Sequence, residues 1–154
     1  METTRPILLF NLKLLKYVDV AEFKRWMFMA ERTLESAIRD MEGGDYNWAC
    51  FKAHQAGEFA VKAVLYGIGK PARGHAITRL LRELTAFVPV GGDAFEDAAL
   101  LDKFYVPTRY VDAWSEGVPY EYYTRRDAEL AIEAARRIIE FAKGLWRSLG
   151  GEKS

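Results

Sequence analysis

The chain has 154 residues, half of them hydrophobic and 14% aromatic, so it is long enough to bury the core of one domain and too apolar to be disordered throughout. Its 22 lysines and arginines balance 22 aspartates and glutamates, and this zero net charge argues against a general binder of polyanions, although a local basic patch is compatible with it. The single cysteine, Cys50, excludes an internal disulfide and any cysteine-based zinc site, and we expect it to be a small core residue.

An apolar extension, residues 1–19, precedes the expected domain at residues 20–150. Asn11 and Lys13 interrupt its hydrophobic residues, and no small-residue cleavage site follows, so the extension does not fit a targeting signal. No stretch of the chain approaches the ~18 apolar residues that a membrane span needs. We therefore expect a cytoplasmic protein that does not contact a membrane, with the extension packed on the domain or on a second copy of it.

Helical periodicity dominates the domain, and the alternation typical of strands is nearly absent. Asp45 and Asp93 are suited to cap the second and fourth helices, and Thr124 with Asp127 resembles a capping box at the start of the last. A loop that contains Arg109 connects the last two helices. The pattern predicts an all-α, up-down bundle of four to five helices. The expected helices span about 20–41, 46–66, 75–88, 94–105 and 125–149.

The second helix carries a polar stripe where a buried helix would favour leucine. At ~100° per residue, Phe51, Glu58 and Lys62 lie close together, with Gln55 and His54 flanking them, opposite a face of small residues, mostly alanine. Small side chains let a neighbouring helix approach, which predicts a central place for this helix. The stripe must then open onto solvent, a groove or another subunit, because an unpaired buried charge is too costly. Spacing alone leaves open whether the stripe is a solvated face with an i,i+4 ion pair or a site.

Arg109 and Tyr110 are the strongest site candidates by side-chain chemistry. A guanidinium can clamp a phosphate through two hydrogen bonds, and a phenol ring can stack on a base. The competing interpretation is that the aromatic residues of this loop cover the end of the bundle, while Arg109 pairs with Glu58 or Asp112. The residues alone leave both interpretations open.

The turn before the third helix, GKPARGH, is a weaker candidate. Lys70 and Arg73 precede a helix N-terminus, which can hold a phosphate, but the residue order of a P-loop is absent. His75 fits a helix cap or the edge of the core as well as it fits a site. We expect neither a metal nor a cofactor, because His54 and His75 lack an adjacent carboxylate cluster.

Two blocks of sequence resemble the HEPN domain (higher eukaryotes and prokaryotes nucleotide-binding). The first is HQAGEFAVKAVLYGIGKPARGHAITRLLREL, and the second is FYVPTRYVDAW, which resembles the Tyr-x-Pro-x-Arg-Tyr loop of many prokaryotic members. The last helix, DAELAIEAARRIIEFAKGL, is also similar, so the resemblance covers about residues 20–148. The positions of the first block that match the family pattern are Gln55, Glu58, Lys62, Ala63, Leu65, His75, Leu80 and Leu81.

The resemblance implies a helical bundle, usually a homodimer, with a groove for nucleotides or RNA. It also implies an operon partner of the minimal nucleotidyltransferase type, in a toxin–antitoxin-like system. On this interpretation Lys62 and Arg109 contact phosphate and Tyr110 contacts the base. Glu58 and Gln55 then orient Arg109 or bind ribose.

Many members of that family are metal-independent ribonucleases that use an arginine, four to six further residues and then a histidine. Here no arginine stands at that spacing before His54 or His75, so the motif is missing and no catalytic residue is assigned. The expected function is therefore nucleotide or RNA binding without strong catalysis. Two alternatives remain: a ribonuclease in which His54 or His75 meets Arg109 in space, and a module that only binds a protein partner.

Overall fold

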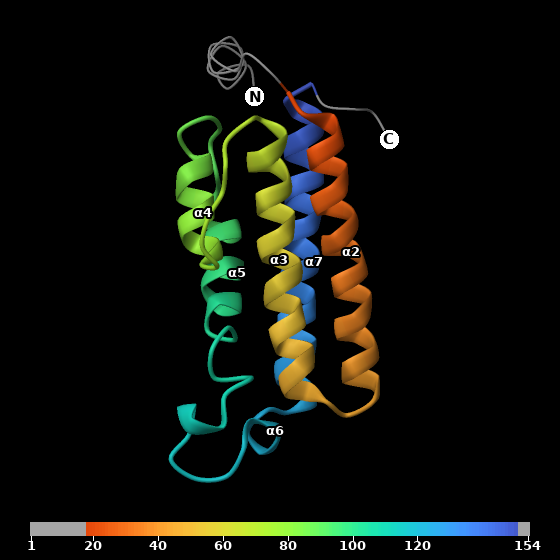
Figure 1. Ribbon diagram of the computed structural model, residues 1–154, viewed down its shortest axis with the longest axis vertical. Helices are drawn as coiled ribbons and strands as arrows, with labels where there is room; N and C mark the ends of the chain where they lie inside the picture. The colour runs from red at the N-terminus through yellow and green to blue at the C-terminus, as the bar shows by residue number, and fades with distance from the viewer. Residues whose placement is uncertain (1–17, 151–154) are drawn as a thin grey trace.

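The computed structural model describes residues 18–150, and within this range every regular element is a helix (Figure 1). The predicted all-α bundle is thereby confirmed. All but Val18 and Asp19 of the expected N-terminal extension lies outside the described residues. The elements, labelled as in Figure 1, are α2 (Val20–Glu42), α3 (Tyr46–Gly67), α4 (Ile77–Leu84), α5 (Gly92–Asp102), the short 3₁₀ helix η1 (Val111–Ala113), α6 (Pro119–Tyr122) and α7 (Arg125–Ser148).

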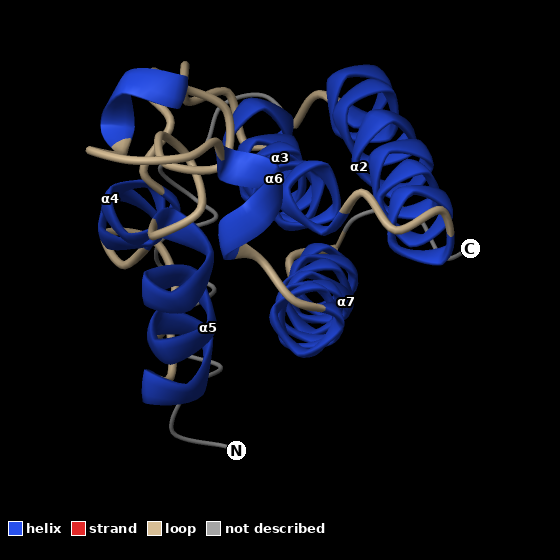
Figure 2. Cartoon of the chain, turned by 90° about the horizontal axis from the view of Figure 1, so that it is seen from below, coloured by secondary structure: helices blue, strands red, loops and turns tan. Residues whose placement is uncertain are grey.

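The helix α3 is the centre of the molecule, as its small residues predict. It packs against α2 and α7 on one side and against α4 and α5 on the other, and the end-on view shows the same order (Figure 2). Its alanines are fully buried, and they allow the neighbouring helices to approach closely. The molecule therefore consists of three long helices, α2, α3 and α7, and a side layer of two short ones, α4 and α5. Within the long-helix part, α3 contacts both short helices.

Local sequence explains most helix starts. Asp19 caps α2 by accepting a hydrogen bond from the Glu22 amide at 3.0 Å. The capping box predicted for α7 is present, with Thr124 and Asp127 as its two members. Asp45 precedes α3 as expected, although its side chain makes no capping hydrogen bond. The prediction for α5 was wrong, because the helix begins at Gly92 and Asp93 lies inside its first turn.

The loop between α5 and α7 is more ordered than its sequence predicts, since it contains η1 and α6. Trp114 stacks on Tyr122 with a centroid distance of 3.8 Å, and its indole nitrogen donates to the Pro107 carbonyl at 2.7 Å. The buried amide of Asn47 on α3 donates to the Thr108 carbonyl at 3.0 Å. These contacts hold the loop against the end of α3 and thereby fix the backbone on both sides of Arg109.

The core excludes Cys50 completely from solvent, which confirms its predicted place. Burial, together with the negative charge of Asp127, raises the pKa of this thiol to about 12. Among the helices within residues 18–150, none combines the length and the apolar composition that crossing a bilayer requires.

Candidate functional site

Most of the polar stripe of α3 is buried, so its interpretation as a solvated helix face was wrong. The exposed fraction of the whole residue is 0% for His54, 1% for Glu58 and 7% for Lys62, and only Gln55 is partly exposed. Such groups are tolerated in a core only when their hydrogen-bonding and charge requirements are met. The partners of each residue therefore show what the stripe does.

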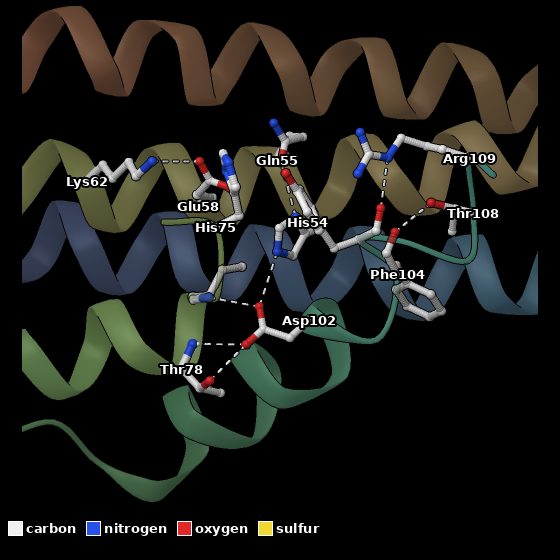
Figure 3. A network of polar contacts seen from close by, with 12 residues as sticks. His54, Gln55, Glu58, Lys62, His75, Thr78, Asp102, Phe104, Thr108 and Arg109 are labelled. Atoms are coloured by element: carbon white, nitrogen blue, oxygen red, sulfur yellow. Dashed lines mark hydrogen bonds and ion pairs between the residues drawn. The ribbon is translucent and has the colours of Figure 1, made fainter. Parts of the chain in front are cut away.

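Glu58 is held between two cationic or protonatable partners. One carboxylate oxygen accepts from the Lys62 ammonium at 2.9 Å, and the other lies 3.1 Å from Nδ1 of His75 (Figure 3). The Lys62 ammonium also lies 5.8 Å from the ring centroid of Trp26. Lys62 is thus committed to balancing the buried carboxylate, and Glu58 in turn fixes the orientation of His75.

His75 is the member of this chain of contacts that reaches solvent, since its side chain is 54% exposed. Its Nδ1–H donates to Glu58, and its ring stacks on Tyr105 with a centroid distance of 4.9 Å and an interplanar angle of 17°. No other residue within 18–150 hydrogen-bonds the ring. Nε2 is therefore the nitrogen that His75 presents to a ligand.

His54 has a different role, because it links α3 to the start of α4 through Asp102. Its Nε2–H donates to Asp102 at 3.1 Å, and its Nδ1 lies 3.2 Å from the Gln55 side-chain oxygen. Asp102 also accepts from the amides of Ile77 at 2.8 Å and Thr78 at 3.1 Å, and from the Thr78 hydroxyl at 2.9 Å. The carboxylate, which ends α5, thereby caps α4 from outside its own helix.

The environment of Asp102 favours its ionised form. Burial raises the pKa of the carboxyl, but the hydrogen bond from His54 and those from Thr78 and Ile77 outweigh burial. The pKa of Asp102 consequently lies below its ordinary value. The first two amides of α4, which the sequence offered as a weaker candidate for holding a phosphate, already donate to this carboxylate.

Arg109 lies among aromatic rings. Its guanidinium carbon is 4.3 Å from the ring centroid of Phe51, 4.4 Å from that of Tyr105 and 4.8 Å from that of Tyr110. Nε donates to the Tyr105 carbonyl at 2.8 Å. Over residues 18–150 no carboxylate lies within ion-pair distance of the guanidinium. The expected contact with Glu58 or Asp112 is absent, because Glu58 is held by Lys62 and His75 instead.

Tyr105 joins these groups into one cluster. Its ring is the common contact of Arg109 and His75, and it also lies 6.1 Å from the Phe51 ring and 5.1 Å from the ring of buried His54. We define the Tyr105 cluster as the five residues Phe51, His75, Tyr105, Arg109 and Tyr110.

The Tyr105 cluster combines residues that sequence reasoning had found with others that it had missed. Arg109, Tyr110 and His75 were site candidates, whereas Phe51 and Tyr105 were not. Asp102, which lies outside the cluster, was also missed. A signal existed for two of the missed residues. Tyr105 opens the Tyr-x-Pro-x-Arg-Tyr block, and Phe51 precedes Gln55 by one helical turn. Nothing local marked Asp102, whose partner on α3 is 48 residues away.

Lys70 and Arg73 do not join the cluster. Both are exposed, and the Lys70 ammonium lies 5.2 Å from the ring centroid of Phe87. The turn that carries them is fixed by the Tyr66 hydroxyl, which donates to the Ala72 carbonyl at 3.0 Å. In the part of the chain that the structure describes, no three histidine, cysteine or acidic side chains gather around a position that could hold a metal ion.

Known proteins share the sequence pattern and the fold of this chain. The family model for the HEPN domain matches residues 23–145. The structure of TT1696 from Thermus thermophilus is 41% identical, with a TM-score of 0.77 over 79% of this chain and 96% of that one. ST0689, an archaeal HEPN homologue, is 43% identical, with a TM-score of 0.69 over 80% and 96% of the two chains.

A HEPN domain protein from Thermotoga maritima is 36% identical, with a TM-score of 0.65 over 80% of this chain and 98% of its own. A comparison with curated protein sequences finds no match. The family match extends from the first turns of α2 almost to the end of α7, and the solved structures share both sequence and fold with this chain. The chain therefore belongs to the HEPN domain family.

Proposed function

We propose that this protein binds a nucleotide or an RNA end at the Tyr105 cluster and has no strong catalytic activity of its own. The observation that carries the proposal is that the charge of Arg109 is not neutralised by a carboxylate. Its guanidinium is held by three aromatic rings and one backbone carbonyl, and no carboxylate among the described residues neutralises it. A fixed cation without a counter-ion is suited to the two-pronged recognition of a phosphate.

The neighbouring residues supply the other contacts that a nucleotide needs. Tyr110 is 48% exposed and offers a ring for base stacking. His75 presents Nε2, and Gln55, which contacts His54, is partly exposed on α3, so that both are suited to ribose hydroxyls or phosphate oxygens. Glu58 and Lys62 act as positioning residues, because they are buried and hold His75 rather than the ligand.

Isothermal titration with AMP, ATP, GTP and a short single-stranded RNA tests the proposal. We expect at least one ligand to bind more tightly than about 100 μM, or ~5.5 kcal/mol, and Arg109→Ala to abolish this binding. Arg109→Lys keeps the charge but loses the planar fork and should also weaken it. Arg125→Ala, at an exposed position of α7, is the matched control and should bind as the wild type does.

Absence of heat with every ligand would contradict the proposal and favour a module that binds only a protein partner. In that case Lys62→Ala, which removes the counter-ion of buried Glu58, should abolish complex formation while no nucleotide binding exists to be lost.

A ribonuclease is the second candidate, because His75 and Arg109 both contact the Tyr105 ring. In such an enzyme Nε2 of His75 would take the proton of a ribose 2′-hydroxyl while Arg109 stabilised charge on the phosphate. His54 is unsuited to this role, since it is fully buried and both ring nitrogens have partners. RNA cleavage in the presence of EDTA that is lost in both His75→Ala and Arg109→Ala would favour this candidate over simple binding.

We also propose that the protein forms a homodimer and works with a minimal nucleotidyltransferase in a toxin–antitoxin-like pair, as the family resemblance implies. Phe28 on α2 supports an interface, because this large apolar side chain is 67% exposed and its burial against another surface is favourable. Light scattering of the purified protein should give twice the chain mass. A monomer at all accessible concentrations would contradict the dimer.

A further inference from the structure

A groove of about 420 Å³ runs between α2 and α3, next to the Tyr105 cluster. Three cations line it, namely Arg32 and Arg39 from α2 and Lys52 from α3, and no carboxylate does. The rings of Phe51 and Phe59 also line it, eight residues apart on α3. At 1.5 Å per residue their backbone positions are separated by ~12 Å, which is the length of about three stacked nucleotides at ~3.4 Å each.

The groove is continuous with the proposed nucleotide site. Phe51 lines the groove and is also 4.3 Å from the guanidinium carbon of Arg109. Gln55 lines the groove and contacts His54. In the view of Figure 3, the side chains of Gln55 and Arg109 both lie on the α2 side of the α3 ribbon. A ligand held by Arg109 therefore has the groove as its direct extension.

The three cations differ in how far they are already neutralised. Arg32 pairs with Glu35 at 2.7 Å, and Lys52 pairs with Asp40 at 2.7 Å and donates to the Ser36 hydroxyl at 3.0 Å. Arg39 is exposed and has no ion-pair partner among residues 18–150. Arg39 is consequently the cation of the groove that is most available to a phosphate.

From this arrangement we propose that the α2–α3 groove binds the strand of a single-stranded RNA whose terminal nucleotide occupies the Tyr105 cluster. The inference rests on the proposed function and narrows its ligand from nucleotides in general to an RNA end with several attached nucleotides. Cations interleaved with aromatic rings are typical of sites that follow a single strand, because the cations contact phosphates and the rings stack on bases. Arg39, the lining cation without an ion-pair partner among residues 18–150, favours an anionic ligand over an apolar peptide.

Fluorescence anisotropy with labelled oligoribonucleotides of two to eight nucleotides, and competition with AMP, tests the inference. Affinity should rise from AMP to an oligonucleotide of about four nucleotides and then level off, because the groove accommodates about three beyond the terminal one. Annealing the same strand to its complement should remove this gain. Arg39→Ala should weaken oligonucleotide binding. It should also make the negative slope of log affinity against log salt concentration shallower by about 0.7, because one phosphate contact is lost.

The matched control is Arg126→Ala, which removes the same charge from an exposed position at the start of α7, outside this groove. It should leave the oligonucleotide affinity near that of the wild type, and Arg39→Ala should leave AMP affinity unchanged. Arg39→Gln, which retains a long polar side chain, should behave as Arg39→Ala does.

The outcomes separate the two proposals. If AMP binds but oligonucleotides bind no more tightly, or if Arg39→Ala matches Arg126→Ala, the groove inference is overturned while the nucleotide site stands. If neither AMP nor any oligonucleotide binds, the proposed function fails and the inference fails with it. An oligonucleotide gain that is lost in both Arg39 variants and retained in Arg126→Ala supports the groove.

Discussion

The carboxylate of Asp102 supplies to α4 the capping group that its own sequence lacks. The residue before this helix is Ala76, whose side chain has no acceptor, whereas the first amides of a helix need one. Asp102 accepts from two of these amides and from His54, so a single side chain connects α3, α4 and α5. The position of His75, two residues before α4, depends on this contact.

Asp102→Asn should destabilise the protein by about 1–3 kcal/mol at pH 7, since an amide cannot replace both carboxylate oxygens as acceptors. The pKa of Asp102 is lower in the folded state, so its stabilisation is complete above the unfolded value of about 3.9 and is lost as the pH falls through the folded-state pKa. Urea unfolding of both proteins from pH 7 downwards should therefore show their free energies of unfolding converging in acid.

The control for this prediction is Asp97→Asn, on the same helix. Asp97 pairs at 2.9 Å with Arg137, whose side chain is exposed, so its removal should cost at most about 1 kcal/mol. A difference between wild type and Asp102→Asn that stays constant across the acid range would show that the charge of Asp102 does not stabilise the fold.

At the scale of the helices, two glycines set how closely α3 approaches its neighbours. A Cβ atom on Gly67 would lie 2.5 Å from the Trp146 ring, which itself stacks on Phe23 at a centroid distance of 4.2 Å. A Cβ on Gly57 would lie 3.0 Å from side-chain carbons of Ile77 and Leu101. Gly67 thus permits the contact of α3 with α2 and α7, and Gly57 its contact with α4 and α5.

Gly67→Ala should lower the free energy of unfolding by about 1–3 kcal/mol, because the added methyl forces the Phe23–Trp146 stack to move. Trp146 fluorescence should change in the same variant. Gly92→Ala is the control: it lies at the start of α5 with nothing within 4 Å of an added Cβ, so stability should be unchanged or slightly higher. Equal melting temperatures for Gly67→Ala and the wild type would contradict this account of the packing.

The bounds of some helices are determined by neighbouring residues in the sequence, and those of others by distant residues. Periodicity predicted the long helices to within one or two residues, and the capping box of Thr124 and Asp127 also marked the start of α7, because both signals lie within the helix concerned. The same reasoning started α4 too early, because its cap comes from Asp102, 24 or 25 residues further along the chain.

The same distinction between local and long-range determinants holds for the candidate site. The spacing of Gln55, Glu58 and Lys62 placed them on one face of α3, and two motif blocks marked His75 and Arg109. The ion pair between Glu58 and Lys62 was predictable from their i,i+4 spacing. The burial of these residues and the contact of Glu58 with His75 were not, because that contact forms only through the turn that brings α4 back along α3. Of the three rings around Arg109, Tyr105 and Tyr110 belong to its own loop, and only Phe51 was hidden, because it lies on a distant helix.

The whole molecule has two parts that meet at the proposed site. The helices α2, α3 and α7 are 22 to 24 residues long, whereas α4 and α5 have 8 and 11 residues. Polar contacts from His54 and Glu58 connect the short helices to α3, and the hydrogen bond from Asn47 to the Thr108 carbonyl connects the Arg109 loop to it. The short helices also bury apolar side chains in the core, but with 8 and 11 residues they have less helical structure of their own than the long helices, so we expect them to open first.

Hydrogen exchange should therefore show α4 and residues 104–114 exchanging through openings that leave α2, α3 and α7 protected. In Asp102→Asn, exchange should accelerate in α4 by more than in α2 or α7, because the lost contacts lie between α3, α4 and α5. An equal acceleration in every helix would instead show that the bundle opens as one unit. In the Tyr105 cluster, Phe51 comes from α3, whereas His75, Tyr105 and Arg109 come from the segments next to or within the part that opens. A ligand bound to the cluster therefore stabilises the closed arrangement of these segments on α3. Bound nucleotide should accordingly slow exchange first in α4 and in residues 104–114.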